Sequence, residues 1–165
     1  MRTWKFGNSI NTDLITPGRY NITTDAKQLA AIAFIEHRPE FSQQVKQGDM
    51  IVAGRNFGCG SSRETAVTAL KECGIEAILA PSFARIFYRN AINQGLVLIV
   101  MDEKFLSGIE ESHKLRLEDG KIINITTGKS SQADVSPMLL ALRKQGGILE
   151  FLKNHKIEEL EKMGL

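Results

Sequence analysis

The sequence predicts an α/β fold built around a parallel β-α-β-α-β unit, and three observations support this prediction. Short, continuously apolar runs alternate with longer segments whose apolar residues recur at helical spacing. Continuous apolar runs, as opposed to alternating ones, are typical of parallel strands that are covered on both faces. Further along, an Asp-Gly pair lies between two strand-like segments, which is typical of an antiparallel hairpin.

The first expected helix spans residues 25–36, because Asp25 followed by Gln28 is a helix-start signal and Pro39 follows the apolar pattern. The parallel core follows it. Its elements are strand Met50–Ala53, helix 62–73, strand Ile75–Ala80, helix 83–93 and strand Leu96–Met101. We expect these strands to pair in parallel, with the helices packed on the sheet.

The rest of the chain is expected to add antiparallel strands and closing helices. Leu115–Leu117 and Ile122–Thr126 form the predicted hairpin around Asp119-Gly120. Ser136 followed by Pro137 begins a helix, and Gly146-Gly147 interrupts it before a final segment, 148–162.

Length and composition fit a single domain spanning residues 1–165. The chain is 42% hydrophobic, enough for a core that buries about two-thirds of the unfolded surface. Its 21 basic and 19 acidic residues give a net charge of +2 and are dispersed, so we expect no nucleic-acid partner.

The longest apolar run, Leu96–Met101, is far shorter than a membrane span of ~20 residues, and the first residues lack a signal-peptide core. We therefore expect a cytoplasmic protein that does not enter a membrane.

Cys59 and Cys73 are the only cysteines. Two thiols are too few for a disulfide framework, a four-thiolate iron–sulfur cluster or a structural zinc site. We therefore expect this chain to hold no metal by itself.

The segment between the first core strand and the next helix contains the residues with the clearest chemical potential. Open α/β sheets bind ligands at such a junction. Its glycines, hydroxyls and guanidinium are Gly58, Gly60, Ser61, Ser62 and Arg63. Together they predict an anion site that contains a hydroxyl. The structural alternative is a capping box, Ser61-x-x-Glu64, but a cap needs only one serine.

Three other motifs fit this segment and its surroundings less well. A dinucleotide fingerprint starting at Gly58 needs a small residue where the chain has Arg63. A phosphate-binding loop ending at residues 128–130 needs a glycine where the chain has Ile123. Cys59 could be a nucleophile before a helix, but no histidine lies near it in the sequence, which disfavours a cysteine hydrolase.

Three stretches together resemble a known enzyme family. They are NTDLITPGRY at residues 11–20, GRNFGCGSSRE at residues 54–64 and APSFARIFYRNAINQGL at residues 80–96. In this order they resemble the small subunits of isopropylmalate isomerase and homoaconitase, and more distantly the swivelling domain of aconitase. The resemblance covers residues from about 4 to 101. It implies a layered β/β/α swivelling fold and a hydro-lyase reaction.

The implied reaction isomerises an alkyl-substituted malate by dehydration and rehydration, most simply 2-isopropylmalate to 3-isopropylmalate in leucine biosynthesis. In this family a [4Fe-4S] cluster, held by the large subunit, acts as a Lewis acid on the departing hydroxyl. The resemblance therefore implies a chain that binds no cofactor itself and is active only with an iron–sulfur large subunit.

The resemblance also implies residue roles. Ser61 matches the general base, which takes a proton from the carbon beside a carboxylate. Ser62 and Arg63 match residues that bind substrate carboxylates, and Gly60 is expected in the same site. Asp13 matches an aspartate of the cleft, although an aspartate in this position could instead cap a turn.

Four polar residues of the third stretch could also contact substrate: Arg85, Arg89, Asn90 and Asn93. The alternative is that their helix presents them to solvent or to a subunit interface.

Residues 16–25 resemble the family's specificity loop. Homoaconitase-type chains carry an arginine two residues after the tyrosine, whereas this chain has Ile22 after Tyr20. An apolar side chain leaves a third carboxylate without a charge partner, so we expect an alkyl substituent. We expect isopropylmalate as the first substrate candidate, a smaller alkyl malate such as dimethylmalate as the second and homoaconitate as the third. A shift of one residue in the loop around Asn21 would change which side chain faces the substrate. A non-enzymatic alternative is a stand-alone carboxylate-binding regulatory module without a large subunit.

Overall fold

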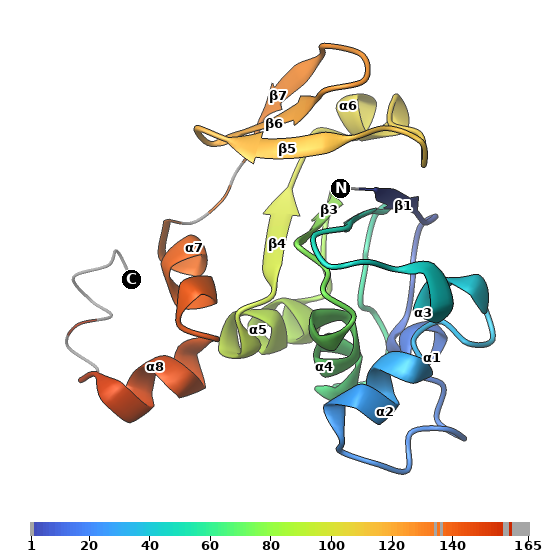
Figure 1. Ribbon diagram of the computed structural model, residues 1–165, viewed down its shortest axis with the longest axis vertical. Coiled ribbons are helices and arrows are strands. Elements are labelled where there is room, and N and C mark those ends of the chain that lie inside the picture. The colour runs from blue at the N-terminus through green and yellow to red at the C-terminus, as the bar shows by residue number, and fades with distance from the viewer. Residues whose placement is uncertain (1, 134, 136, 157–158, 160–165) are drawn as a thin grey trace.

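The structure is a computed structural model that describes residues 2–133, 135, 137–156 and 159. A four-stranded parallel sheet carries helices on one face and a three-stranded antiparallel sheet on the other (Figure 1). The predicted α/β class, with a parallel core and an antiparallel hairpin in β/β/α layers, is confirmed.

The parallel sheet has the strand order β1-β2-β3-β4. Its strands are β1 (Thr3–Lys5), β2 (Met50–Val52), β3 (Ala77–Ala80) and β4 (Val97–Val100). The three predicted core strands are confirmed with slightly shorter bounds. The edge strand β1 was not predicted, because three residues are too few to show a pattern.

Two helices cover the sheet between the core strands, α4 (Thr65–Glu72) and α5 (Arg85–Gln94). Each begins two or three residues after its predicted start. Ser82 does not cap α5, as its hydroxyl accepts a hydrogen bond from the Asn56 backbone N–H at 2.9 Å.

The helix predicted at 25–36 is shorter in the structure. α2 (Ala26–Ala31) begins as expected, with the Asp25 carboxylate accepting from the Gln28 N–H at 2.9 Å. It stops early because Phe34 has a positive φ of 57° and donates its N–H to the Ile15 carbonyl instead of continuing the helix.

The remaining helices are α1 (Thr12–Ile15), α3 (Glu40–Gln44), α6 (Glu103–Ser107), α7 (Pro137–Lys144) and α8 (Ile148–Asn154). The first three are short and were not predicted. The predicted break at Gly146-Gly147 separates α7 from α8. Part of the predicted segment 148–162, and the expected cap Ser136, lie outside the described residues. Among the described residues no helix combines the length and apolarity needed to cross a membrane.

The antiparallel sheet contains β5 (Leu115–Glu118), β6 (Lys121–Asn124) and β7 (Ser130–Gln132). Asp119 and Gly120 both have positive φ, 50° and 70°, as the predicted type I′ turn requires. The hairpin is confirmed, and β7 adds a third strand that was not predicted.

Two cores lie on opposite faces of the parallel sheet, because neighbouring residues of a strand point in opposite directions. Ile51, Ile78 and Leu98 pack toward the helices, in the same cluster as Val67, Leu70 and Phe87. Val52, Leu79 and Ile99 pack toward the antiparallel sheet, in the same cluster as Leu115 and Ile122.

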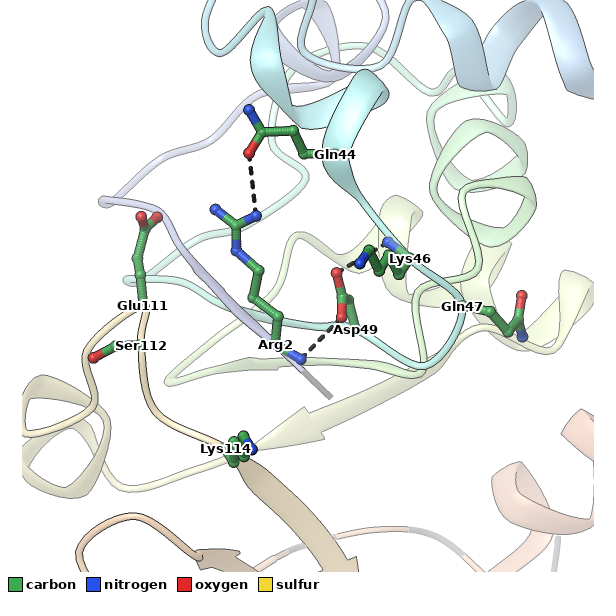
Figure 2. Close-up of a pocket in the computed structure, with 8 residues that line it drawn as sticks. All are labelled: Arg2, Gln44, Lys46, Gln47, Asp49, Glu111, Ser112 and Lys114. Carbon is green, nitrogen blue, oxygen red and sulfur yellow. Dashed lines mark hydrogen bonds between the residues drawn. The ribbon is translucent and has the colours of Figure 1, made fainter.

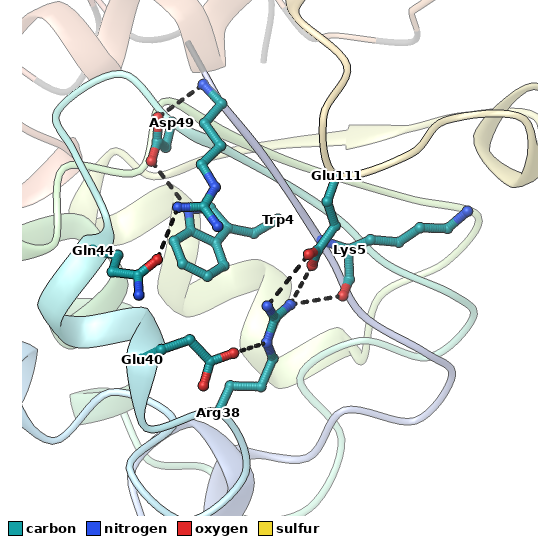
Figure 3. Close-up of polar contacts among 8 residues, drawn as sticks. Trp4, Lys5, Arg38, Glu40, Gln44, Asp49 and Glu111 are labelled. Atoms are coloured by element: carbon teal, nitrogen blue, oxygen red, sulfur yellow. Dashed lines mark hydrogen bonds and ion pairs between the residues drawn. The ribbon is translucent and has the colours of Figure 1, made fainter.

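Side chains from distant segments hold β1 at the edge of the sheet (Figure 3). The buried Trp4 donates its indole N–H to Asp49 at 3.0 Å. Arg38 lies 5.0 Å from the Trp4 ring, donates to the Lys5 carbonyl at 3.2 Å and pairs with Glu111. These contacts supply the stability that a three-residue strand lacks alone.

Candidate active site

The candidate site lies on the loop that joins β2 to α4, at the carboxyl end of the parallel sheet. The loop is held on one side by the chain after β1, where the Gly58 N–H donates to the Ile10 carbonyl at 2.7 Å. On the other side it is held by the chain after β3, where the Phe57 N–H donates to the Ser82 carbonyl at 3.1 Å. A loop with little regular structure therefore has a fixed position between two neighbouring connections.

Ser61 is an exposed residue of this loop, and its hydroxyl contacts Thr12. The two hydroxyl oxygens lie 3.0 Å apart, and the Thr12 hydroxyl also lies 3.2 Å from the Ser61 carbonyl. Thr12 is only 1% exposed. The sequence reasoning did not assign Thr12, and the only signal available was its place directly before Asp13.

The capping-box alternative for Ser61 is wrong. The residue at the N-cap of α4 is Glu64, and it forms no side-chain capping bond. The hydroxyl of Ser61 instead contacts Thr12, so it is not used to start the helix.

Arg63 and Asp13 form an ion pair beside this hydroxyl pair. Arg63 also donates to the Thr16 carbonyl at 3.4 Å. Asp13 does not cap the turn, because Asn11 does so by accepting the Leu14 N–H at 2.7 Å. Both members of the pair remain partly exposed. The arrangement leaves guanidinium donors available for a carboxylate ligand.

The two glycines have different roles. Gly58 has a φ of 79°, and a Cβ there would come within 2.1 Å of the Phe87 ring. Its role is therefore close packing against α5 and not access for a ligand, which corrects the prediction. Gly60 also has a positive φ, 94°, but it is exposed and its built Cβ would stay 3.4 Å or more from other atoms. Gly60 thus borders the site.

Side chains of α5 hold the β2–α4 loop by hydrogen bonds to its backbone carbonyls. Asn90, 4% exposed, donates to the Ser62 carbonyl at 3.3 Å, and Gln94 donates to the Glu64 carbonyl at 3.2 Å. Asn90 therefore positions the loop and is not free for a substrate. Arg85 and Arg89 are exposed and line a pocket of about 670 Å³ together with Gly60.

Ile22 lies in an exposed loop next to the start of α4. Its side chain is 88% exposed. The neighbouring Asn21 donates its side-chain amide to the Thr65 hydroxyl at 3.0 Å, while its buried Oδ1 has no partner among the described residues. The loop and Thr65 line an open pocket of about 590 Å³.

The thiols do not fit a metal site. Burial, with a smaller contribution from Glu72, raises the pKa of the Cys73 thiol to about 12. The Cys59 thiol lies 3.5 Å from the Ser9 carbonyl. In the described part of the chain no three His, Cys, Asp or Glu side chains are grouped so that they could hold a metal ion. These residues do not fit as ligands of an iron–sulfur cluster.

A third pocket, of about 480 Å³, lies at the amino end of the parallel strands, and Figure 2 shows the residues that line it. Its buried Asp49 accepts backbone N–H groups of Arg2 at 2.9 Å and Lys46 at 3.0 Å, besides the Trp4 indole. Its Glu111 pairs with Arg38. Because these carboxylates are occupied by structural bonds, we assign no chemistry to this pocket.

Comparisons with known proteins identify the family of the chain. The aconitase C-terminal domain family matches residues 6–104. The isopropylmalate/citramalate isomerase small subunit of Methanocaldococcus jannaschii is 45% identical over 95% of both chains. The methanogen homoaconitase small subunit of Methanothermobacter thermautotrophicus is 47% identical over 97% of this chain and 91% of that one.

A solved structure shows the same fold. The crystal structure of 3-isopropylmalate dehydratase from Methanocaldococcus jannaschii covers 98% of this chain and 96% of its own, with a TM-score of 0.86 and 41% identity. The predicted resemblance is confirmed by both the profile match and these near full-length relatives. The chain therefore belongs to the aconitase C-terminal domain family.

Proposed function

We propose that this chain is the small subunit of a 3-isopropylmalate dehydratase, which isomerises 2-isopropylmalate to 3-isopropylmalate together with a large subunit. The observation that carries the proposal is the exposed Ser61 hydroxyl beside the Arg63–Asp13 pair at the carboxyl end of the sheet. Near full-length relatives named as isopropylmalate isomerase or dehydratase small subunits support it.

In this proposal Ser61 is the catalytic base. Its oxygen removes a proton from the carbon next to a substrate carboxylate and later returns one. A serine oxygen is a weak base unless its anion is stabilised. Thr12 is placed to do this, because its hydroxyl can turn from the Ser61 carbonyl, 3.2 Å away, to the Ser61 oxygen, 3.0 Å away.

Arg63 holds a substrate carboxylate through a charge-assisted hydrogen bond. Asp13 orients the guanidinium before the substrate arrives, because the two side chains already form an ion pair. The exposed Ser62 hydroxyl and the backbone of Gly60 complete the carboxylate site. None of these groups is fully buried in the chain alone, so a covering partner is needed to exclude water.

The partner in this proposal is a large subunit that holds a [4Fe-4S] cluster, which supplies Lewis-acid chemistry to the hydroxyl of the substrate. The residues of this chain act on the proton and the carboxylates.

The substrate we propose has an alkyl substituent, because Ile22 is apolar where homoaconitase-type chains have an arginine. Overall identity does not separate the substrates, as relatives named for isopropylmalate, citramalate and homoaconitate are all 45–47% identical. The apolar Ile22 therefore ranks the candidates, with isopropylmalate first, a smaller alkyl malate such as dimethylmalate second and homoaconitate third.

The test is reconstitution of the enzyme from separately purified subunits. The cluster-loaded large subunit of the same organism is mixed with this chain, and isopropylmalate, citramalate, dimethylmalate and homoaconitate are compared by kcat/KM. We expect turnover only in the mixture, with isopropylmalate best. Ligand binding without complex formation would instead support a carboxylate-binding regulatory module.

A further inference from the structure

We propose that the pocket between the N-terminal half of α5 and the Ser61 loop is a docking surface for an acidic segment of the large subunit. The inference rests on the function proposed above and adds the place and chemistry of the subunit contact. The pocket has a volume of about 670 Å³, and its walls include Asn56, Gly60, Phe83, Arg85, Ile86 and Arg89.

The pocket carries positive charge that the chain does not balance. Arg85 and Arg89 are one helical turn apart and exposed, and none of the residues lining the pocket is acidic. Within the described part of the chain, neither guanidinium has an ion pair. Like charges four residues apart destabilise a helix, so an acidic group from outside would remove a cost that the isolated chain bears.

This lack of a partner is unusual for the arginines of the chain. Six other arginines pair with a carboxylate: Arg19, Arg38, Arg55, Arg63, Arg116 and Arg143. Arg2, the remaining one, stacks over the Trp4 ring at 4.1 Å and donates to Gln44. Arg85 and Arg89 are thus the arginines whose charge is left for a group outside this chain.

The same helix face offers an apolar anchor. Ile86 is 43% exposed between the two arginines, and the half-buried Phe83 lies on the same wall. Arginine and aromatic residues are enriched at protein interfaces, and apolar side chains gather at the centre of such a contact. A protein segment with acidic residues around an apolar side chain complements this surface.

The position of the pocket connects it to the reaction. Gly60 lines the pocket and directly precedes Ser61. A segment seated against Arg85 and Arg89 therefore reaches the edge of the catalytic loop, where water has to be excluded. Docking at this surface would couple assembly of the two subunits to completion of the active site.

The experiment measures the affinity of the two full-length subunits. The variant Arg85→Gln/Arg89→Gln is compared with Lys104→Gln/Lys144→Gln, which removes the same charge at exposed residues outside this pocket. Calorimetric titration with the cluster-loaded large subunit gives Kd, and assays at saturating large subunit give kcat and KM. A third variant, Ile86→Ser, tests the apolar contact without a change of charge.

We expect the arginine variant to raise Kd roughly 10- to 100-fold and to weaken its dependence on salt, because the lost interactions are electrostatic. kcat at saturation should stay within about twofold of the wild type, and the lysine variant should change Kd by less than about threefold. Ile86→Ser should also raise Kd. Matching thermal melts of the free chains would exclude misfolding.

Two results would overturn the docking surface while leaving the proposed function standing. One is an unchanged Kd with a raised KM, which would assign the arginines to a substrate carboxylate. The other is a Kd that rises equally in the lysine variant, which would indicate a general effect of net charge. If the wild-type chain neither bound the large subunit nor gave turnover with it, the proposed function would fail, and the docking surface with it.

Discussion

Replacing Thr12 with valine tests the proposed chemistry most directly, because valine keeps the shape of the buried side chain and removes only its hydroxyl. We expect kcat to fall while KM changes little. The reason is that Thr12 stabilises charge on the Ser61 oxygen, which develops during proton transfer and not during substrate binding. Thr12→Ser should restore most of the activity, since it returns the hydroxyl.

The magnitude follows from the contact. The two hydroxyl oxygens are 3.0 Å apart, which is an ordinary hydrogen-bond distance. A hydrogen bond to a charged group contributes about 1.5–3 kcal/mol. Because each 1.36 kcal/mol changes a rate about tenfold, kcat should fall roughly 10- to 150-fold. Ser61→Ala should cost more, roughly 10²- to 10⁴-fold, since it removes the base itself.

A double-mutant cycle decides whether Thr12 acts through Ser61. If it does, Thr12→Val added to Ser61→Ala should cause no further loss of kcat. The assay is steady-state isomerisation at saturating substrate and saturating large subunit. If Thr12→Val lowered kcat by the same factor in the Ser61→Ala variant as in the wild type, the reasoning would be refuted and Thr12 would be a structural residue. An unchanged kcat in Ser61→Ala would refute the role of Ser61 as well.

The other predictions concern the carboxylate site, the substrate and the edge strand. Arg63→Lys should lower kcat/KM roughly 10- to 150-fold, because one ammonium cannot bond both Asp13 and a substrate carboxylate in the geometry of a guanidinium; steady-state kinetics measure it, and an unchanged KM would contradict it. Ile22→Arg should lower kcat/KM for isopropylmalate and raise it for homoaconitate; an equal loss on both would remove Ile22 from substrate choice. Burial acts to raise the pKa of the Glu111 carboxyl, but hydrogen bonds from Arg38 and Lys5 and the charges of Arg38 and Arg2 outweigh it, so the pKa lies below its ordinary value. The stability from this pair is therefore present above the ordinary pKa of a glutamate, about 4.3, and is lost as pH falls through the lowered pKa. Denaturant unfolding should show a steeper acid loss in wild type than in Glu111→Gln, with a difference at pH 7 below about 1 kcal/mol because the pair is partly exposed.

The sequence predicts those parts of the fold that depend on a pattern of a few neighbouring residues. Continuous apolar runs identified three parallel strands, and Asp119-Gly120 identified the hairpin turn, because both signals lie within a few residues. β1 could not be found in this way. Its position depends on Asp49, which is 45 residues from Trp4 along the chain, and on Arg38, which reaches Glu111 across 73 residues.

In the candidate site, too, the sequence predicts residues that belong to local motifs but not contacts between distant segments. Ser61, Arg63 and Asp13 were singled out from their motifs, and the structure brings all three to one end of the sheet. Thr12 and Asn90 were not assigned their contacts, because these join residues 49 and 28 positions apart. A pattern indicates which side chains have suitable chemistry, whereas only the packed fold shows which neighbour supports them.

The exposure of the site gives a physical reason for a two-subunit enzyme. A serine anion in open water would take a proton from the solvent before it could take one from a carbon acid, so the proposed role of Ser61 as a base requires that water is excluded. The chain holds this residue firmly through Thr12 but leaves it exposed. The loop around it is held on one side by α5 and by the segments after β1 and β3, and its residues 60–62 are exposed. Rigid support behind an uncovered hydroxyl is what a half-site requires if its second half is to close over it without rearranging it.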